Sequence, residues 1–363
     1  MTEQIQPQSE ARSAHWPALD GVRAVAIILV VIYHLGHLTA GWIGVDVFFV
    51  LSGFLITTLL LGEQAQRQRI RLRAFWARRA KRLLPAVMLM LIVIGAYAWA
   101  GGPGIVGAQL RAPALATLFY TANWQQLAAS HSYFAQFTAP DPLTHTWSLA
   151  IEEQYYIVWP ILLLGIFAVA RWLSHRSGGS QPRPTLNRRR TTMRSEIGVL
   201  IKTTFALFVA SAVWMGFAAH LWGANRAYLG TDTRAWELLL GGLGAMLWRP
   251  SGTSGEGANL RIWSIAALSG AAGLAVIVGL AGATTANGRP PSWIWSGGLV
   301  GAGVCSLLAI VGSVRAPRGP LARVLSMLAF RWLGWISYSL YLWHWPAITL
   351  ITASTTGLTG TWL

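Results

Sequence analysis

Long apolar runs without a single charged residue are the feature that most constrains this chain. Residues 262–281 and 290–314 contain no Asp, Glu, Lys or Arg. A helix of roughly 20 apolar residues crosses a bilayer, and its backbone polar groups are all bonded within the helix. Charged residues make up 11% of the 363 residues, against about 25% in soluble domains. The sequence therefore predicts an all-α membrane protein, a polytopic transmembrane helical bundle.

The spacing of apolar runs predicts about nine to ten spans, with one re-entrant or interfacial segment. That segment, 112–127, is weakened by Pro113 and by amide side chains such as Asn123 and Gln125. If it does not cross, the basic clusters at 67–82 and 176–194 face the same side, which the positive-inside bias makes cytoplasmic. The predicted spans are 19–38, 43–61, 83–100, 147–173, 197–220, 235–248, 262–281, 293–314 and 332–351.

The same pattern predicts the organisation of the chain. Residues 1–18 form a cytoplasmic amino-terminal tail, 19–352 a transmembrane domain, and 174–196 within it a mobile basic cytoplasmic loop. Residues 353–363 read as the start of an outer loop, so we expect the full protein to continue. The net charge of +16 does not indicate nucleic acid binding, because the basic residues gather between spans, where they would face the headgroups of the lipid bilayer.

Ionisable residues inside spans are costly and are therefore functional candidates. Arg23 and His34 are eleven residues apart, so they lie on the same face of a helix, about 16 Å apart along its axis. His34 could act as a proton acceptor, or could be a histidine satisfied by a neighbouring backbone group. Asp46 could orient His34 across a short hairpin, or could be an interfacial cap.

Further candidates lie in three later segments. Glu152 and Glu153 point about 100° apart on one helix and would serve different partners, or form a structural ion pair with an arginine. Arg234 could bind a carboxylate or an acceptor, or simply follow a helix cap. Tyr341 and His344 share a face with Ser337, beside the kink expected at Pro346, and line either a cavity or an aromatic contact.

A basic patch stands where the third span leaves the cytoplasm. Arg78, Arg79 and Arg82 suit phosphate groups through their forked donors, or serve only to set topology. The sequence contains no Gly-rich phosphate loop of the Walker type and no spacing for a tight metal site, so no metal is expected. Cys305 lies in an apolar span and is interpreted as a packing residue.

Six motifs in order resemble the bacterial acyltransferase-3 family of membrane O-acyltransferases. The motifs are Arg23-x10-His34, Gly44-Val-Asp46-Val-Phe-Phe, Phe75-Trp-Ala-Arg-Arg-Ala-Lys-Arg-Leu-Leu-Pro85, Trp147-Ser-Leu-Ala-Ile-Glu-Glu-Gln-Tyr-Tyr156, Tyr228-Leu-Gly-Thr-Asp-Thr-Arg234 and Tyr338-Ser-Leu-Tyr-Leu-Trp-His-Trp-Pro346. Together they extend over essentially the whole chain, and a chance match in register is unlikely for six motifs at once.

The resemblance implies transfer of an acyl group, by family default acetyl, from cytoplasmic acyl-CoA to a hydroxyl of an extracytoplasmic glycan or glycolipid. It implies that 19–352 is an acyltransferase domain of the bacterial cytoplasmic (inner) membrane, with a cytoplasmic amino terminus. His34 is implied to be catalytic, and the arginines to bind the donor. Many relatives continue into an extracytoplasmic SGNH domain, which this chain does not contain.

The buried ionisable residues and the resemblance together define the expected site. Catalytic candidates are His34, Asp46, Glu152 and Glu153, and donor-binding candidates are Arg23, Arg78, Arg79 and Arg82. Substrate or oxyanion candidates are Trp147, Tyr228, Arg234, Tyr341 and His344. Two other functions remain open: a transporter or flippase for a lipid-linked glycan, and a membrane scaffold for another domain.

Overall fold

Helices make up nearly all of the chain that the structure describes. The computed structural model describes residues 15–102, 107–129, 133–135, 141–176, 186–248, 260–285 and 289–351, with only the backbone at 108, 135, 173–176 and 186–195. The helices are α1 (Pro17–His34), α2 (Gly44–Arg67), α3 (Leu72–Trp99), α4 (Gly107–Leu118), α5 (Ala122–Ala128), α6 (Thr146–Arg176), α7 (Leu186–Trp222), α8 (Ala224–Leu229), α9 (Thr231–Leu247), α10 (Leu260–Thr284), α11 (Leu299–Arg315), α12 (Pro320–Leu325) and α13 (Leu328–Leu350), with short helical turns at Gly41–Ile43, Tyr133–Ala135 and Ile294–Gly298.

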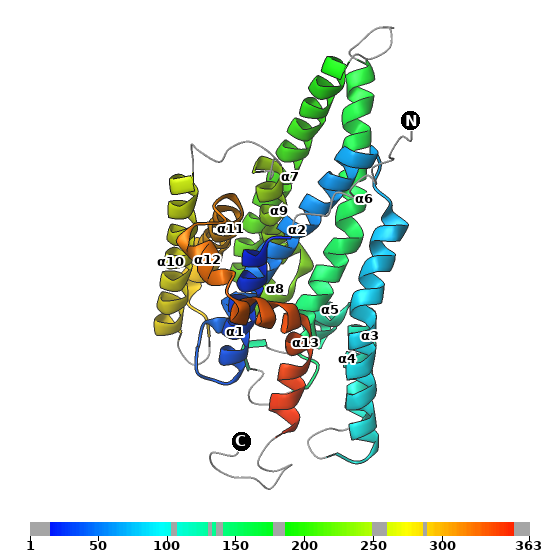
Figure 1. Ribbon diagram of the computed structural model, residues 1–363. Coiled ribbons are helices and arrows are strands. Elements are labelled where there is room, and N and C mark those ends of the chain that lie inside the picture. Colours follow the sequence, from blue (N-terminus) through cyan, green and yellow to red (C-terminus); the bar gives the residue numbers. More distant parts are fainter. Residues whose placement is uncertain are drawn as a thin grey trace, which may run out of the picture.

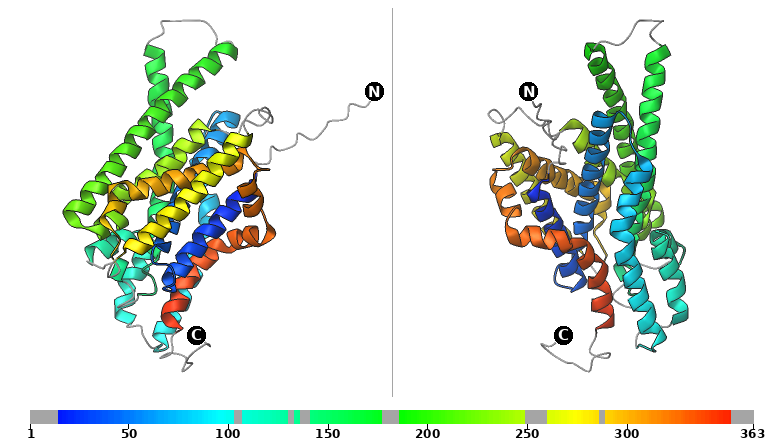
Figure 2. Two further views of the ribbon diagram at one scale, coloured as in Figure 1. Left: turned by 90° about the vertical axis from the view of Figure 1, so that its left-hand side faces the viewer. Right: turned by 45° about the vertical axis from the view of Figure 1, so that its right-hand side comes forward.

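The long helices form a bundle around α2. This helix contacts α1, α6, α9 and α11, while α13 packs along α1. Figure 1 shows α10 at one edge of the bundle and α3 with α4 at the opposite edge. Helices α6 and α7 project beyond the others at one end, as the two further views also show (Figure 2).

Seven helical segments are long and apolar enough to cross a membrane: Pro17–His34, Gly41–Arg67, Leu72–Trp99, Thr146–Trp172, Glu196–Trp222, Leu260–Thr284 and Ile294–Arg315. The predicted class, an all-α polytopic membrane protein, is confirmed. The two other predicted spans correspond to α9 and α13. Helix α9 has only 17 residues and is buried from Trp236 to Met246, so it is enclosed by its neighbours and faces little lipid. The number of crossings stays a prediction.

The weak segment 112–127 is broken into two short helices. Helix α4 ends at Leu118 and α5 begins at Ala122, and between them Tyr120 has a φ of +55°, a conformation that interrupts a helix. A single crossing helix over 112–127 is therefore absent from this described segment, in line with the prediction that it does not cross.

Two segments expected as connections are partly helical. Helix α3 begins at Leu72, so the arginines from Arg73 to Arg82 belong to its first turns and not to a loop. Helix α6 extends to Arg176 and α7 begins at Leu186, which leaves only 177–185 of the predicted loop 174–196 outside the described residues. The predicted outer segment 353–363 and most of the tail 1–18 also lie outside them.

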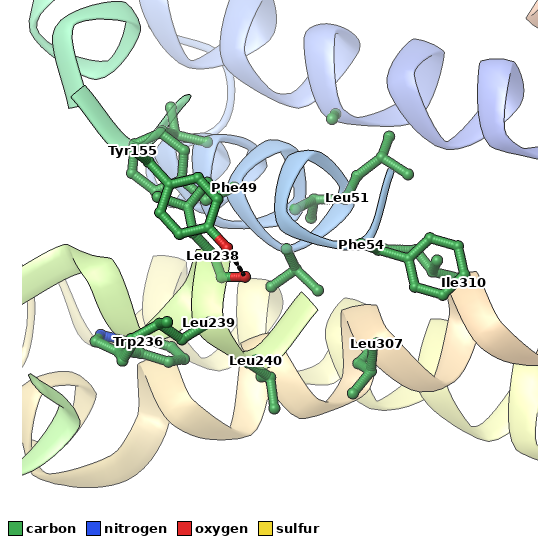
Figure 3. Packing of buried hydrophobic residues seen from close by; sticks show 14 of the residues in the cluster. Phe49, Leu51, Phe54, Tyr155, Trp236, Leu238, Leu239, Leu240, Leu307 and Ile310 are labelled. Atoms are coloured by element: carbon green, nitrogen blue, oxygen red, sulfur yellow. Dashed lines mark hydrogen bonds between the residues drawn. The ribbon is translucent and has the colours of Figure 1, made fainter. Parts of the chain in front are cut away.

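Reciprocal glycines bring α2 and α9 into close contact. A Cβ at Gly53 would overlap the backbone carbonyl of Leu238, and a Cβ at Gly241 would overlap that of Val50. Small residues allow helix backbones to approach in this way in membranes. Figure 3 shows the surrounding apolar packing, in which Phe54 of α2 points toward Ile310 of α11.

We predict that Gly53→Ala destabilises the protein by roughly 1–3 kcal/mol, since the added methyl must force two backbones apart. Gly62 on the same helix is the matched control, because a Cβ there meets nothing within 4 Å. Gly62→Ala is expected to be neutral or to stabilise by up to about 1 kcal/mol. Thermal unfolding in detergent measures both variants, and equal melting temperatures would contradict the predicted close contact.

Candidate functional site

Two histidines from opposite ends of the chain meet inside the bundle. His34 ends α1 and His344 lies in α13, and both are buried. His344 Nε2 lies 3.1 Å from His34 Nδ1, and the ring centroids are 4.9 Å apart. The Trp345 ring lies 4.7 Å from that of His34. The structure thus joins two candidates that the sequence analysis had given separate roles.

A third histidine, His145, was not singled out from the sequence. It is buried just before α6, and its ring lies 5.5 Å from that of His344. Its Nε2 is 3.2 Å from the carbonyl oxygen of Leu342. Pro346 has no N–H to give this carbonyl, which lies four residues before it. The proline therefore leaves an acceptor in α13 that a donor from elsewhere must satisfy.

Two further hydrogen bonds fasten the segment before α6 to α13. Trp345 Nε1 donates to the carbonyl oxygen of Asp141 at 2.8 Å, and Tyr341 donates its hydroxyl to the carbonyl oxygen of His145. The Tyr341 hydroxyl also lies 2.6 Å from Ser148 Oγ. The positions of His145, Tyr341 and His344 are therefore interdependent.

A cavity of about 120 Å³ lies next to the histidines, between α2, α3, α6 and α13. Ser148 and Tyr341 line it, and the Tyr341 ring is 5.6 Å from that of His344. The polar lining residues are Arg23, Ser52, Arg79, Arg82, Ser148, Glu152, Glu153, Tyr156, Ser337, Tyr338 and Tyr341. Neither His34 nor His344 is among the lining residues.

The arginines lie along the cavity from α1 and α3. Arg79 Cζ stacks 3.5 Å from the ring centre of Tyr156, while Arg23 pairs with Asp20 at 3.1 Å. Arg79 and Arg82 are three residues apart and face the same side of α3. Arg78 is exposed and is not a lining residue. Of the expected donor-binding residues, the structure brings three together and leaves Arg78 apart.

The two glutamates have different surroundings, as expected from their angular separation. Glu152 accepts hydrogen bonds from Ser52 at 2.8 Å and from Tyr156 at 3.4 Å. Glu153 lines the cavity, and its buried Oε1 has no hydrogen-bond partner among the described residues. Neither glutamate forms an ion pair with an arginine in the described part of the chain, so the expected alternative of a structural ion pair is not seen there.

Asp46 and Arg234 form a separate buried cluster. Arg234 Nη2 lies 3.0 Å from Asp46 Oδ1 and 3.2 Å from Glu237 Oε1, and all three side chains are fully buried. We expected Asp46 to orient His34 across the short hairpin. Its partner is Arg234 instead, because the close approach of α2 and α9 brings these two side chains together.

Trp147 and Tyr228 surround the same cluster. The guanidinium carbon of Arg234 lies 4.6 Å from the ring centre of Tyr228 and 6.0 Å from that of Trp147. All three are buried, and none lines the cavity. These expected substrate or oxyanion candidates therefore contact one another, and of that group only Tyr341 lines the cavity. Within the described residues, no three His, Cys, Asp or Glu side chains are arranged to bind a metal ion.

Comparison with known proteins agrees with the motifs. A family model described as an acyltransferase domain (acyltransferase-3) matches residues 16–363. The chain is 36% identical over 340 residues to the peptidoglycan O-acetyltransferase OatA of Listeria monocytogenes, covering 93% of this chain and 50% of that protein. It is also 36% identical to the O-acetyltransferase OatA of Staphylococcus aureus (strain NCTC 8325 / PS 47), covering 93% and 51%.

The chain spans about half the length of these curated relatives. No solved structure matches it. The family match extends over nearly the whole chain, and it includes every helix described above. The resemblance predicted from six motifs is thereby confirmed, and the chain belongs to the acyltransferase-3 family of membrane acyltransferases.

Proposed function

We propose that this chain transfers an acetyl group from cytoplasmic acetyl-CoA to a hydroxyl of an extracytoplasmic glycan, with His34 as the base. The acceptor class follows the name of the Listeria relative, a peptidoglycan O-acetyltransferase. One observation carries the proposal. One cavity is lined by arginines and also by Tyr341, which packs against His344, and His344 in turn contacts His34.

The two groups of lining residues are separated along α6. Arg79 stacks on Tyr156, whereas Tyr341 contacts Ser148. Eight residues of helix separate these positions, or about 12 Å at 1.5 Å per residue. A nucleotide polyanion bound by the arginines could therefore extend its flexible arm along the cavity toward the histidines. Forked guanidinium donors suit phosphate groups for this purpose.

The reaction needs a base and a stabilised oxyanion. The basic nitrogen of His34 takes the proton of the acceptor hydroxyl, and the oxygen attacks the thioester carbonyl carbon. The C–S bond then breaks, and the CoA thiolate leaves and takes up a proton. Ser148 lines the cavity, and its hydroxyl could donate to the oxygen that becomes negative in place of its bond to Tyr341.

The proposed membrane is the bacterial cytoplasmic membrane, with the amino end of α1 facing the cytoplasm. The basic first turns of α3 support this orientation, since Lys and Arg concentrate on the cytoplasmic side. Arg23, Arg79 and Arg82 then lie where a cytoplasmic donor arrives, and His34 lies toward the outer half.

Binding of acetyl-CoA distinguishes this proposal from a transporter or flippase. We expect the purified chain in nanodiscs to bind acetyl-CoA and to transfer a radiolabelled acetyl group to a peptidoglycan fragment. Movement of a lipid-linked glycan without acetyl-CoA binding would instead favour a transporter. If the chain neither transfers acetyl groups nor moves a lipid-linked glycan, the remaining candidate is a membrane scaffold for another domain.

We predict that Arg79→Ala with Arg82→Ala weakens acetyl-CoA binding by about tenfold or more, since each charge-assisted bond contributes about 1.5–3 kcal/mol. Arg78→Ala is the matched control, because this exposed arginine lies on another face of α3. Isothermal titration with acetyl-CoA measures the three dissociation constants. If the dissociation constant of the double variant changes no more than that of the control, Arg79 and Arg82 serve only to set the membrane topology.

A further inference from the structure

The hydrogen bonds of His344 and His34 determine which nitrogen of each ring bears hydrogen. His344 Nδ1 lies 2.7 Å from the carbonyl oxygen of Tyr341 and 3.1 Å from that of Leu340. A carbonyl oxygen only accepts, so Nδ1 of the neutral ring must carry the hydrogen. The Nε2 of His344 is consequently left with a lone pair, and this lone pair faces His34.

The same reasoning applies to His34. Its Nδ1 lies 2.9 Å from the carbonyl oxygen of Val30 and 3.1 Å from His344 Nε2. Both of these neighbours are acceptors, so His34 Nδ1 carries a hydrogen that the two share. In the neutral ring, Nε2 is then the nitrogen that can accept a proton.

We propose that His344 is a positioning residue that holds His34 with hydrogen on Nδ1 and so makes His34 Nε2 the base. This inference rests on the proposed function. In many hydrolytic triads a carboxylate orients the catalytic histidine, and here His344 would do so. The Nε2 lone pair of His344 also accepts from Nδ1 after His34 is protonated, which stabilises the imidazolium without burying a second charge.

The cluster supplies what this arrangement needs to stay aligned. His344 is fixed by two backbone carbonyls of its own helix, and α13 is fastened through Leu342 to His145. Two carboxylates of the expected catalytic set are engaged elsewhere: Asp46 pairs with Arg234, and Glu152 accepts from Ser52. Within the described residues, neither carboxylate contacts His34.

Two substitutions separate positioning from packing. His344→Gln keeps an oxygen able to accept from His34 Nδ1, whereas His344→Phe keeps a buried ring without an acceptor. We expect His344→Phe to lower kcat about 100-fold with an unchanged KM for acetyl-CoA, and His344→Gln to retain at least a tenth of wild-type kcat. If His344 only packed its ring, His344→Phe would keep more activity than His344→Gln. A higher kcat for His344→Phe would therefore overturn the proposal.

A spectroscopic measurement tests the same inference without depending on activity. In full-length protein labelled with ¹⁵N-histidine, the His34 signals are assigned by their loss in His34→Asn. We expect the Nδ1–H form for His34 and a through-bond N–H···N coupling to His344, both unaffected by the exposed control His220→Gln. Hydrogen on His34 Nε2 would overturn the inference. If the spectrum is as expected but the protein transfers no acetyl group, the proposed function fails while the inference about the histidine pair stands.

Discussion

Replacing His34 by asparagine is expected to lower acetyl transfer roughly 10²–10⁴-fold, the usual contribution of a general base. The asparagine amide can still donate to the carbonyl oxygen of Val30, as Nδ1 of the histidine does, but it has no basic nitrogen. Acetyl-CoA binding should be unchanged, because the arginines that line the cavity come from other positions. Initial rates with labelled acetyl-CoA measure the effect.

His220→Asn is the matched control for this prediction. His220 is exposed near the end of α7, outside the histidine cluster. Its replacement should leave both the rate and the thermal stability unchanged. A His34→Asn variant that keeps the wild-type rate and fold would eliminate the proposed base.

The largest predicted effect on stability is at Arg234. Arg234→Ala leaves Asp46 and Glu237 buried without the cation that pairs with both, and breaking a buried pair in this way costs about 3–5 kcal/mol. Two carboxyl groups share this single guanidinium, so removing the charge of one still leaves Arg234 paired with the other. Glu237→Gln should therefore cost much less than Arg234→Ala. Thermal unfolding in detergent, or expression level where the variant does not fold, compares the two.

The Arg226–Asp232 pair provides the control. Its carboxylate and guanidinium lie 2.6 Å apart, but the two side chains are 24% and 40% exposed. Partly exposed pairs contribute about 0–1 kcal/mol. Arg226→Ala should therefore have a small effect, and a loss of stability as large as that of Arg234→Ala would refute the argument from burial.

Features within one helix were predictable from the sequence. The spacing of Arg23 and His34 predicted a shared face. Arg23 lines the cavity, whereas His34 contacts His344, which packs on the lining residue Tyr341. Hydropathy predicted the long apolar helices, because each helix must satisfy its own backbone in a bilayer. The different surroundings of Glu152 and Glu153 likewise follow from the 100° turn between adjacent residues.

Contacts between helices could not be predicted in this way. Asp46 was assigned to His34 because both flank a short hairpin, yet its partner is 188 positions along the chain. That pairing depends on how closely α2 and α9 approach each other. The spacing of residues within either helix does not predict this distance. His145 was missed because it stands just outside a span. The available signal was Pro346, whose missing N–H requires a donor for Leu342 from another segment.

The bond between His145 and the Leu342 carbonyl also makes the site sensitive to its surroundings. An unsatisfied carbonyl costs several kcal/mol where no water can replace the lost donor. Detergents that admit water would weaken this constraint, while a tightly packed bilayer would strengthen it. The rigidity of the histidine cluster should therefore vary with the lipid in which the protein is reconstituted.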